Sequence, residues 1–468
     1  MKVVVVGGGI AGLAAARRLE ALIPEVEIVL VERTERLGGK LVTEHVDGFL
    51  IEGAPDSFLS RKERGVGLCE ELDLADDLVG RRLENARSFV RRGYELHPLP
   101  EGLTGMIPTD LDALTESELL SSAGRERLAA EVDLPPAPPG GDESIAGFVS
   151  RRLGREAYDN LVEPLMTGIY GGDGERLSLQ ATFPGLRTLE IEHGSLIRGL
   201  LAQSAESVSD YPPFLTLRSG METLVRALVS SLERTNTLSR CIADRVRSRS
   251  GGGYVIEIRD GWTMEADGVV LAVPAFAVAK LLSELDPDIA AVHGEIPLAS
   301  SAVVTLAYRL EQVRRPLDGY GYVVPRAESS DVLACTWTSS KWENRAPEGF
   351  ALLRVFAGRF GERDVTRMDK DDLIALARQE VRLLGIEAEP HLVRIHRWRY
   401  GMPQYVLGHP ERVAGIETAV AAHPGLALAG AAYHGVGIPD CIRSGENAAQ
   451  SIAQSLDAAS GRTVLEAK

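Results

Sequence analysis

The sequence predicts an α/β protein of several domains: a parallel-sheet domain, a mixed α+β domain and a mostly helical domain. The chain has 468 residues, whereas a single hydrophobic core stops growing at roughly 250–300 residues. Its first residues read strand, glycine turn, helix and strand, and its last residues read strand, glycine loop and helix. Alternation of this kind indicates a parallel sheet, to which both ends of the chain contribute.

The N-terminal segment carries the pattern of a nucleotide-binding unit. Residues 3–6 (VVVV) form a β-branched run that is typical of a buried parallel strand. Residues 7–12 (GGGIAG) follow, residues 13–22 predict a helix rich in Ala and Leu, and residues 28–31 predict a second strand that ends at Glu32. This order of strand, glycine turn, helix, strand and acid is that of a Rossmann-type unit.

Each glycine of the turn has its own task in such a unit. Gly7 makes the tight turn, Gly9 lets the backbone approach a pyrophosphate, and Gly12 lets the helix pack closely on the strand. The pyrophosphate then lies at the helix N-terminus, where free N–H groups and the helix dipole favour anions. The predicted phosphate contacts are therefore Gly7, Gly9, Ile10, Ala11 and Gly12.

The acid at the end of the second strand favours FAD or NAD over NADP. Glu32 lies 20 residues beyond Gly12, and a carboxylate at this spacing accepts hydrogen bonds from a ribose. Its negative charge disfavours a 2′-phosphate, although the cationic Arg33 stands next to it. Glu32 and Arg33 are both candidate cofactor contacts.

Two further segments favour FAD over NAD. Residues 36–40 (RLGGK) resemble the segment that lies along the FAD diphosphate in flavoproteins similar to glutathione reductase. Residues 426–429 predict a strand, residues 430–439 (GAAYHGVGIP) a glycine loop and residues 442–456 a helix, and the same flavoproteins return to the cofactor with such elements. The resemblance implies cofactor contacts from Arg36, Gly38, Gly39, Lys40, Gly430, Gly435, Val436, Gly437 and Ile438.

The glutathione-reductase-like FAD domain is predicted to be discontinuous. Residues 246–258 alternate like a strand pair around the glycines at 251–253, and residues 268–274 predict another buried strand. In these flavoproteins a backbone contact from Val246 would hold the adenine. We assign the FAD domain to residues 1–48, 218–284 and 395–468, a mixed α+β substrate domain to 49–77, 201–217 and 285–394, and a helical domain to 78–200.

Charge and composition exclude several function classes. The formal net charge is −16 and no basic block occurs, which argues against nucleic-acid binding. The four cysteines have neither disulfide nor zinc spacing, so we expect reduced, buried thiols and no metal site. The sequence has no uninterrupted run of about 18 apolar residues, so we expect no membrane span. The apolar N-terminus is interrupted by glycines and lacks the cleavage site of a signal peptide. We expect a cytoplasmic protein, with peripheral membrane contact left open.

Several motifs resemble those of the FAD-dependent porphyrinogen oxidases and occur in the same order along the whole chain. They are DGFLIE at 47–52, PDSF at 55–58, EPLMTGIY at 163–170, SL at 178–179, FP at 183–184, CTW at 335–337, MPQY at 402–405 and GVGIPDCI at 435–442. The likeness is greatest to the soluble bacterial branch, whose members oxidise coproporphyrinogen III to coproporphyrin III. One position departs from the family: Ala54 stands where Gly commonly precedes Pro-Asp-Ser, so this turn beside the flavin is expected to differ slightly.

The resemblance implies three successive two-electron oxidations in haem biosynthesis. Each step passes a hydride from the porphyrinogen to flavin N5, and O2 reoxidises the flavin with release of H2O2. The cofactor supplies this redox chemistry, so no metal is required and no residue stands out as a catalytic base. The resemblance also implies flavin contacts from Ala54, Pro55, Asp56, Ser57 and Trp398.

The substrate that the resemblance implies is a large apolar disc with carboxylate side chains, which requires apolar walls and a cationic rim. Lys62, a few residues after the Pro55-Asp56-Ser57 segment, is the first candidate for a carboxylate partner, with Arg61 beside it. Ordinary surface or core roles are the alternative for each candidate. The candidate apolar walls are Ile169, Tyr170, Trp337 and Met402.

Other functions stay open at this point. A protoporphyrinogen IX oxidase, a flavin amine oxidase and a polyene desaturase share the cofactor architecture, and a flavin-binding or haem-delivery protein without turnover is a further alternative. The expected small-molecule partners are a porphyrinogen and O2. The sequence leaves open the oligomeric state and the transfer of the product to a ferrochelatase.

Overall fold

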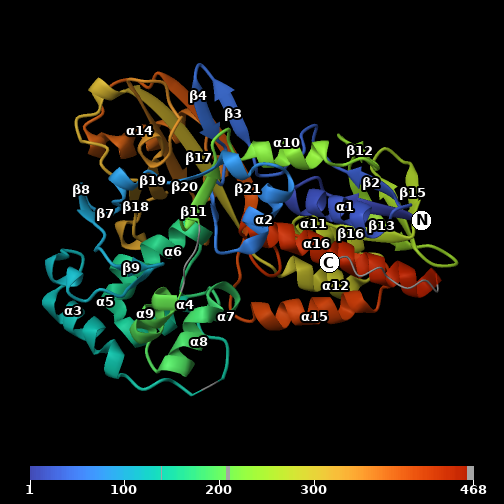
Figure 1. Cartoon of the computed structure of the whole chain (residues 1–468), viewed down its shortest axis with the longest axis horizontal. Coiled ribbons are helices and arrows are strands. Elements are labelled where there is room, and N and C mark those ends of the chain that lie inside the picture. The colour runs from blue at the N-terminus through green and yellow to red at the C-terminus, as the bar shows by residue number, and fades with distance from the viewer. Residues whose placement is uncertain (139, 207–210, 461–468) are drawn as a thin grey trace.

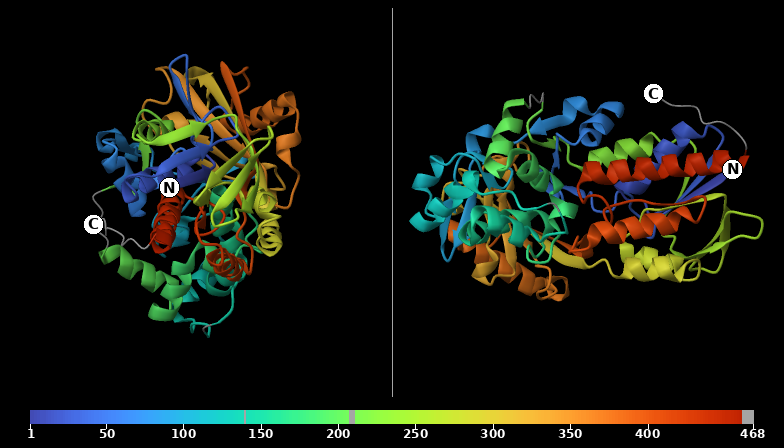
Figure 2. Two further views of the ribbon diagram at one scale, coloured as in Figure 1. Left: turned by 90° about the vertical axis from the view of Figure 1, so that its right-hand side faces the viewer. Right: turned by 90° about the horizontal axis from the view of Figure 1, so that it is seen from below.

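The chain folds into three regions, which Figure 1 shows side by side. The computed structural model describes residues 1–138, 140–206 and 211–460. A parallel-sheet region holds the first and last of the described elements, a second region surrounds a seven-stranded sheet, and a third consists mainly of helices. Figure 2 shows the parallel-sheet region extending away from the other two, with helix α16 (Ile438–Ser460) lying along it. The predicted α/β fold class is confirmed.

Five parallel strands form the first sheet, in the order β12-β2-β1-β16-β22. Side chains of β1 alternate between two cores: Val3 and Val5 pack with helix α16, whereas Val4 and Val6 pack on the opposite face. Burial on both faces explains the continuous β-branched run. The strands are β1 (Lys2–Val6), β2 (Glu27–Val31), β12 (Thr235–Leu238), β16 (Gly268–Leu271) and β22 (Leu426–Leu428).

Different elements cover the two faces of this sheet. Helices α1 (Ile10–Leu22), α10 (Glu222–Ser230) and α16 share the core on one face. A small antiparallel sheet and helices α11 (Ala275–Leu282) and α12 (Pro287–Gly294) cover the other, and α15 (His409–Ala421) packs beside α12. The predicted strand pair around residues 251–253 is confirmed. The antiparallel strands are β13 (Ala243–Ser248), β14 (Tyr254–Ile258) and β15 (Thr263–Ala266).

The second region is a sheet of seven strands in the order β21-β17-β20-β19-β18-β7-β8. Helix α14 (Lys370–Val381) packs on one face. The strands near residues 302–310, 332–338 and 351–357 and the helix near 371–384 are confirmed, with slightly different ends. The strands are β7 (Phe89–Arg92), β8 (Glu95–Pro98), β17 (Leu298–Arg309), β18 (Gly321–Val323), β19 (Val332–Trp337), β20 (Phe350–Ala357) and β21 (Leu392–Pro403).

Two stretches contribute to this sheet although the sequence placed them elsewhere. Strands β7 and β8 fall within residues 78–200, the predicted helical domain, and β21 extends into residues 395–468, the predicted FAD domain. Both make ladder hydrogen bonds whose partners are distant in sequence, so local periodicity did not indicate them. The three domain boundaries themselves remain predictions.

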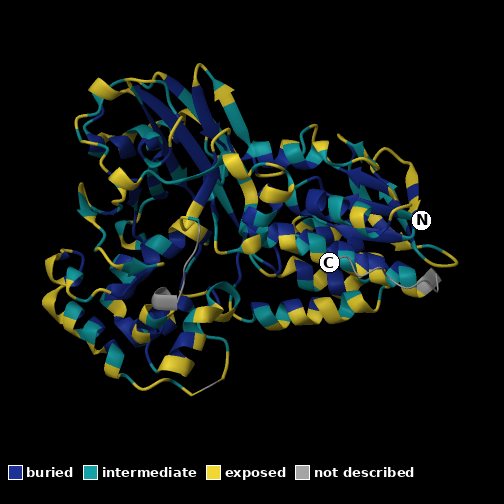
Figure 3. Cartoon of the chain, in the orientation of Figure 1, coloured by how far each residue is buried: buried dark blue, intermediate teal, exposed yellow. Residues whose placement is uncertain are grey.

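The third region is a cluster of short helices at the lower left of Figure 1. Its apolar side chains form a core of their own, to which the loop residue Val436 also packs. The buried faces of the sheets and the exposed outer faces of the helices are visible in Figure 3. The helices are α3 (Ser122–Ala129), α4 (Ile145–Leu153), α5 (Arg155–Ala157), α6 (Glu163–Tyr170), α7 (Leu179–Thr182), α8 (Pro184–His193) and α9 (Leu196–Glu206).

Small sheets connect the regions near the predicted site. A hairpin of β3 (Thr43–Val46) and β4 (Phe49–Glu52) leads to a three-stranded antiparallel sheet in the order β5-β11-β6, and α2 (Glu63–Glu71) follows β5. The three strands are β5 (Phe58–Leu59), β6 (Leu78–Gly80) and β11 (Phe214–Leu217). Within the described residues, no helix is both long and apolar enough to cross a membrane.

Candidate functional site

The first and last strands of the chain bring their glycine loops to one edge of the parallel sheet. β1 and β22 lie on either side of β16, and all three run in the same direction. Their carboxyl ends therefore meet at the same edge, where ligands of open α/β sheets bind. Helix α16 packs on α1 so closely that a Cβ on Gly445 would collide with the carbonyl oxygen of Ala11. The fold thus joins the two segments predicted to hold one cofactor.

The glycines of the N-terminal turn fall into two classes. Gly7 has φ +110°, and a Cβ there would collide with the carbonyl oxygen of Ala272. A Cβ on Gly12 would likewise collide with the carbonyl oxygen of Gly7, so both glycines are required for packing. No other heavy atom of the described chain lies within 4 Å of a Cβ built on Gly9. Gly9 therefore has room beside it and is the N-cap of α1, where backbone N–H groups favour a phosphate.

Glu32 is tied to the glycine turn by its carboxylate. One oxygen accepts a hydrogen bond from the backbone N–H of Gly8 at 2.9 Å, and the other accepts from the backbone and hydroxyl of Thr34, each at 2.8 Å. The carboxylate is half-buried, whereas Arg33 is exposed. The oxygen that accepts from Gly8 keeps a second lone pair, so Glu32 both fixes the turn and has acceptor capacity for a ribose.

The segment at residues 36–40 lies directly against the glycine turn. The backbone N–H of Gly38 donates to the carbonyl oxygen of Gly8 at 2.7 Å, and Gly38 forms a β-bridge with Gly9. The guanidinium of Arg36 donates to backbone carbonyls of its own segment, including that of Leu41 at 2.7 Å. Arg36 therefore braces the loop with its side chain.

Gly39 and Lys40 line the same side of the turn. Gly39 has φ +60°, and a Cβ there would lie 3.2 Å from the Cα of Gly9. Lys40 is exposed as a residue, but desolvation of its ammonium by the surrounding protein lowers the pKa of that group. The predicted diphosphate contacts Gly9, Gly38, Gly39 and Lys40 are thus brought together.

Residues 53–57, which we call the 53–57 loop, are held by side chains of the seven-stranded sheet and its helix α13 (Thr338–Lys341). The indole N–H of Trp398 donates to the carbonyl oxygen of Gly53 at 2.9 Å, and Arg354 donates to that of Ala54. The side chain of Asp56 accepts from the indole N–H of Trp342 at 3.1 Å. Trp398 and Arg354 of the seven-stranded sheet thus hold the backbone of the loop at Gly53 and Ala54.

Two buried carboxylates, Asp56 in the loop and Glu52 next to it, have pKa values that are shifted in opposite directions. Burial alone would raise the pKa of Asp56, but Lys341 at 3.2 Å and Arg354 at 3.3 Å hold it below its usual value. Glu52 is fully buried, and this burial raises its pKa to about 7, although hydrogen bonds from Met221 and Thr43 oppose the rise. Asp56 is therefore a permanent anion within a cluster of cations, whereas Glu52 titrates near neutral pH.

The C-terminal glycine loop is braced by a buried tyrosine. The hydroxyl of Tyr405 donates to the carbonyl oxygen of Ala431 at 2.7 Å and accepts from the backbone N–H of Gly435 at 2.9 Å. Gly430 and Gly435 have φ of +113° and +140°, a region that L side chains rarely adopt. Gly437 follows, and α16 begins at Ile438, so a helix N-terminus faces the edge at which the loops meet.

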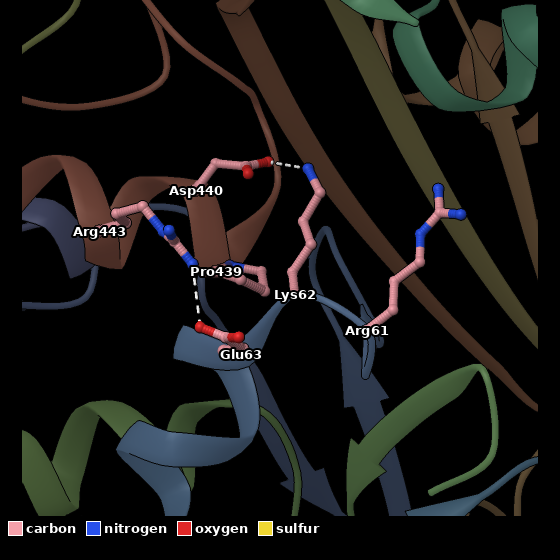
Figure 4. A pocket seen from close by; sticks show the side chains of 6 residues that line it. All are labelled: Arg61, Lys62, Glu63, Pro439, Asp440 and Arg443. Carbon is pink, nitrogen blue, oxygen red and sulfur yellow. Dashed lines mark hydrogen bonds and ion pairs between the residues drawn. The ribbon is translucent and has the colours of Figure 1, made fainter. Parts of the chain in front are cut away.

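A pocket of about 400 Å³ lies beside the first turn of α16 and contains both predicted carboxylate partners (Figure 4). The ammonium of Lys62 forms an ion pair with Asp440 at 2.5 Å. Arg61 is exposed, and Figure 4 shows its side chain extending beside that of Lys62, with its guanidinium farther to the right. The pocket is lined by Arg61, Lys62, Glu63, Pro439, Asp440 and Arg443. Its cations outnumber its anions in a protein whose net charge is −16.

The predicted apolar walls are placed in different surroundings. Tyr170 is buried against Phe183, with ring centroids 5.7 Å apart, whereas Ile169 is 48% exposed. Met402 lies half-buried near the end of β21. Trp337 is fully buried in the core that α14 covers, next to Phe89 and Tyr322. These contacts favour a core role for Trp337 and do not join it to the other candidates.

Other predicted residues also have defined places. Val246 is buried in β13, an edge strand, and the chain just before β13 hydrogen-bonds to residues 32 and 34. This connection brings β13 towards the ribose side of the predicted site. Pro55 and Ser57 are half-buried, and the Ser57 hydroxyl donates to Asp56 at 2.9 Å. The four cysteines, Cys69, Cys241, Cys335 and Cys441, are buried and unpaired, as predicted.

Comparison with known proteins decides the family. The profile described as flavin containing amine oxidoreductase matches residues 10–453. The chain belongs to this flavin-containing family. A coproporphyrinogen III oxidase of Bacillus subtilis is 37% identical over 458 residues, which cover 95% of this chain and 96% of that protein. The coproporphyrinogen III oxidase of Staphylococcus aureus is 31% identical, over 96% of this chain and 98% of that protein.

Solved structures agree with the family. A putative protoporphyrinogen oxidase from an Exiguobacterium species has a TM-score of 0.87 and 34% identity, over 97% of this chain and 98% of that one. A reduced UDP-galactopyranose mutase shares the fold, with a TM-score of 0.70 at 15% identity. The FAD cofactor and the oxidoreductase class predicted from the sequence are confirmed by this membership of a flavin-containing family.

The residues present fit the cofactor of the family. Gly9 leaves room beside the N-terminus of α1, the Glu32 carboxylate has spare acceptor capacity, and the segment at 36–40 lies against the same turn. The 53–57 loop and the C-terminal loop are fixed by side chains that sequence reasoning did not select, namely Lys341, Trp342, Arg354 and Tyr405. A signal was available for Tyr405, which lies in the quoted MPQY motif. The other three follow no local pattern.

Proposed function

We propose that this protein is an oxygen-dependent coproporphyrinogen III oxidase, which uses FAD to form coproporphyrin III and H2O2 in haem biosynthesis. The observation that carries the proposal is the 37% identity, over nearly the full length of both chains, to the coproporphyrinogen III oxidase of Bacillus subtilis. The cationic pocket around Lys62 also supports it, because a tetra-acid requires local positive charge in a protein with net charge −16.

The protein contributes position and electrostatics to the reaction that we propose. Bound FAD would supply the two-electron acceptor. The 53–57 loop and the C-terminal loop, held by Arg354 and Tyr405, would fix the two sides of the site. Lys62 and Arg61 would hold carboxylates of the porphyrinogen, and Tyr170 and Met402 would contribute apolar walls. Protons lost from the macrocycle would pass to water, so the proposal requires no side chain as a base.

The deciding experiment compares two porphyrinogens aerobically. The holoenzyme is incubated with coproporphyrinogen III and, separately, with protoporphyrinogen IX, and porphyrin fluorescence is followed. We expect a higher kcat/KM for coproporphyrinogen III, and a KM that rises with salt as the carboxylate contacts are screened. Equal or faster turnover of protoporphyrinogen IX would contradict the substrate assignment but leave the reaction class in place.

Lys62 provides a sharper test of the same proposal. Lys62→Ala is expected to raise KM for coproporphyrinogen III more than for protoporphyrinogen IX, with the flavin spectrum unchanged, because the former carries two more carboxylates. The matched control is Lys280→Ala, since Lys280 pairs with Asp244 on the outer surface. If Lys62 serves only to hold Asp440, both substrates will respond equally.

A protoporphyrinogen IX oxidase is the second candidate. The chloroplastic protoporphyrinogen oxidase of Nicotiana tabacum is 28% identical over 96% of this chain. The fluorescence comparison separates the two substrates. A flavin amine oxidase belongs to the same family, and production of H2O2 from amines without porphyrinogen turnover would favour it.

We further propose a cytoplasmic location and direct transfer of coproporphyrin to a ferrochelatase. A planar tetra-acid product is soluble in water, so the proposed cytoplasmic location requires no membrane contact. Fractionation of cells that express the tagged protein tests the location, with a membrane pellet as the contrary result. Stopped-flow transfer of porphyrin to a ferrochelatase tests the transfer: a rate independent of acceptor concentration would mean free release.

A further inference from the structure

The small sheet β5-β11-β6 gathers three cations at one of its ends. β11 is antiparallel to both neighbours, with Phe214 opposite Leu59 of β5 and Leu215 opposite Gly80 of β6. The end of β5, the beginning of β11 and the end of β6 therefore lie together. Arg61 and Lys62 follow β5 after one residue, and Arg81 follows β6 directly. Arg81 was not selected from the sequence, and the proposed function has not used it.

The guanidinium of Arg81 packs on two aromatic rings, Phe214 and Tyr320, which we call its clamp. Its guanidinium carbon lies 4.5 Å from the ring centroid of Phe214 and 4.7 Å from that of Tyr320. Tyr320 is itself fixed, because its hydroxyl donates to the carbonyl oxygen of Arg82 at 2.9 Å. A guanidinium that packs on aromatic rings leaves the N–H groups of its edge free to donate. This geometry prepares Arg81 for a planar, bidentate acceptor such as a carboxylate.

The edge of the Arg81 guanidinium has no acceptor within the part of the chain that the structure describes. Arg81 makes no hydrogen bond or ion pair there, although its side chain is only half-buried. Neighbouring cations differ: Lys62 is paired with Asp440 at 2.5 Å, and Arg82 with Glu84 at 2.8 Å. Arg81 is thus a positioned cation with free donors.

The nearby anion Asp56 does not satisfy Arg81. Its carboxylate already accepts from Ser57, Lys341 and Trp342, and Arg354 lies 3.3 Å away. Asp56 is near enough to Arg81 to influence its pKa, which burial lowers, but it is not within ion-pair distance. The cluster therefore carries more positive than negative charge next to the 53–57 loop.

We propose that Arg81 binds a carboxylate of the substrate through the edge of its guanidinium, with Phe214 and Tyr320 as the clamp that orients it. The inference rests on the proposed function and deepens it, because it names a partner for a substrate carboxylate, a cation that pairs with no acidic residue in the described ranges. It also assigns the shared end of β5 and β6 as the cationic rim of the substrate site, with Arg61, Lys62 and Arg81 as its members. A porphyrinogen with several carboxylates suits such a row of cations.

The experiment uses the FAD-loaded enzyme and measures binding and turnover separately. Arg81→Gln is expected to raise KM for coproporphyrinogen III by about tenfold or more, the scale of one hydrogen bond to a charged group, with kcat changed less than about twofold. Arg81→Lys keeps the charge but loses the planar fork, so a smaller rise is expected. The matched control, Arg82→Gln, removes the adjacent surface arginine and is expected to change neither constant.

A second measurement separates carboxylate binding from a structural effect. The affinity for coproporphyrin III and for its tetramethyl ester is measured by fluorescence, in the same detergent, for the wild-type protein and Arg81→Gln. We expect the substitution to weaken binding of the acid and not of the ester. Equal weakening of both, or loss of flavin in both Arg81 variants, would show a structural role and overturn the inference.

The outcomes also separate this inference from the proposed function. If the wild-type protein turns over coproporphyrinogen III and Arg81→Gln binds coproporphyrin III normally, only the role of Arg81 is wrong. If the wild-type protein neither turns over coproporphyrinogen III nor binds coproporphyrin III, the proposed function is wrong and the inference fails with it.

Discussion

The two ends of the cofactor site are constructed differently. The phosphate end is built from contacts within the first 41 residues, such as those that join the backbone of Gly8 to the Glu32 carboxylate and to the backbone of Gly38. The 53–57 loop is held by side chains that lie 285 to 345 residues further along the chain, on Lys341, Arg354 and Trp398. The first arrangement follows from a local motif, whereas the second exists only after the seven-stranded sheet has formed.

This difference determines how each end responds to substitution. At the phosphate end, the fold and the cofactor contact can be separated, because Gly9 has room beside it whereas Gly7 and Gly12 do not. At the 53–57 loop the fold and the cofactor contact cannot be separated, because Asp56 and Arg354 form a buried ion pair. Removing one partner of a buried ion pair leaves an uncompensated charge. The predictions below test this contrast.

The largest effect is expected from Gly9→Val. A side chain at Gly9 would occupy the space that the pyrophosphate needs, so FAD affinity should fall by more than about a hundredfold. Thermal unfolding of the flavin-free protein should change by less than about 2 °C, because no packing is disturbed. The ratio of flavin to protein absorbance and calorimetry of the flavin-free protein measure the two quantities. Normal flavin content would refute the site, and Gly12→Val, which should unfold the domain, is the contrasting control.

Asp56→Asn should lower the free energy of unfolding by about 3–5 kcal/mol, because Lys341 and Arg354 lose their anion. Urea unfolding of the flavin-free protein, followed by circular dichroism, measures the change. Glu84→Gln removes a surface ion pair with Arg82 and serves as the control, with an unchanged midpoint expected. A stable Asp56→Asn variant would mean that the loop does not depend on this cluster.

Glu52 should make stability depend on pH near neutrality. Its pKa in the folded state is about 7, above the ordinary 4.5, so folding favours its protonated form. Its contribution is complete below pH about 4.5 and is lost as pH rises through 7, a change of about 3 kcal/mol. Relative to the wild type, Glu52→Gln should therefore become more stable as the pH is raised from 5 to 8. Parallel curves of unfolding free energy against pH for the two proteins would show that Glu52 titrates normally.

The smallest effect is expected from Glu32→Ala. Loss of the carboxylate should weaken FAD binding by about 1–3 kcal/mol, the scale of hydrogen bonds to a charged group. Titration of the flavin-free protein with FAD measures it, and Glu32→Gln should retain part of the affinity because it keeps an acceptor. An unchanged dissociation constant would assign Glu32 to bracing Gly8 and Thr34 alone.

Sequence reasoning was most successful where the signal is local. The turn at residues 7–12, the segment at 36–40 and the C-terminal loop were each found from glycine spacing next to a strand and a helix, and the structure brings them together. It was least successful for β7 and β21, whose partners β18 and β17 are distant in sequence, and for β8, which joins the sheet only through β7. Trp337 shows a related limit, because an apolar residue in a motif reads the same whether it faces a pocket or a core.

By itself, the sequence determined the cofactor and the family. Nucleotide binding depends on short-range backbone geometry, and the spacing of the glycines and of Glu32 along the chain indicates that geometry. The tertiary structure alone decided that Asp56, Lys341 and Arg354 fix the 53–57 loop, and that the Arg81 guanidinium has no acceptor among the described residues. Asp56 meets Lys341 and Arg354 only when the loop packs on the seven-stranded sheet, and Arg81 meets the ring of Phe214 only after β6 and β11 pair. Charges act through space rather than along the chain, so their partners cannot be read from the order of residues.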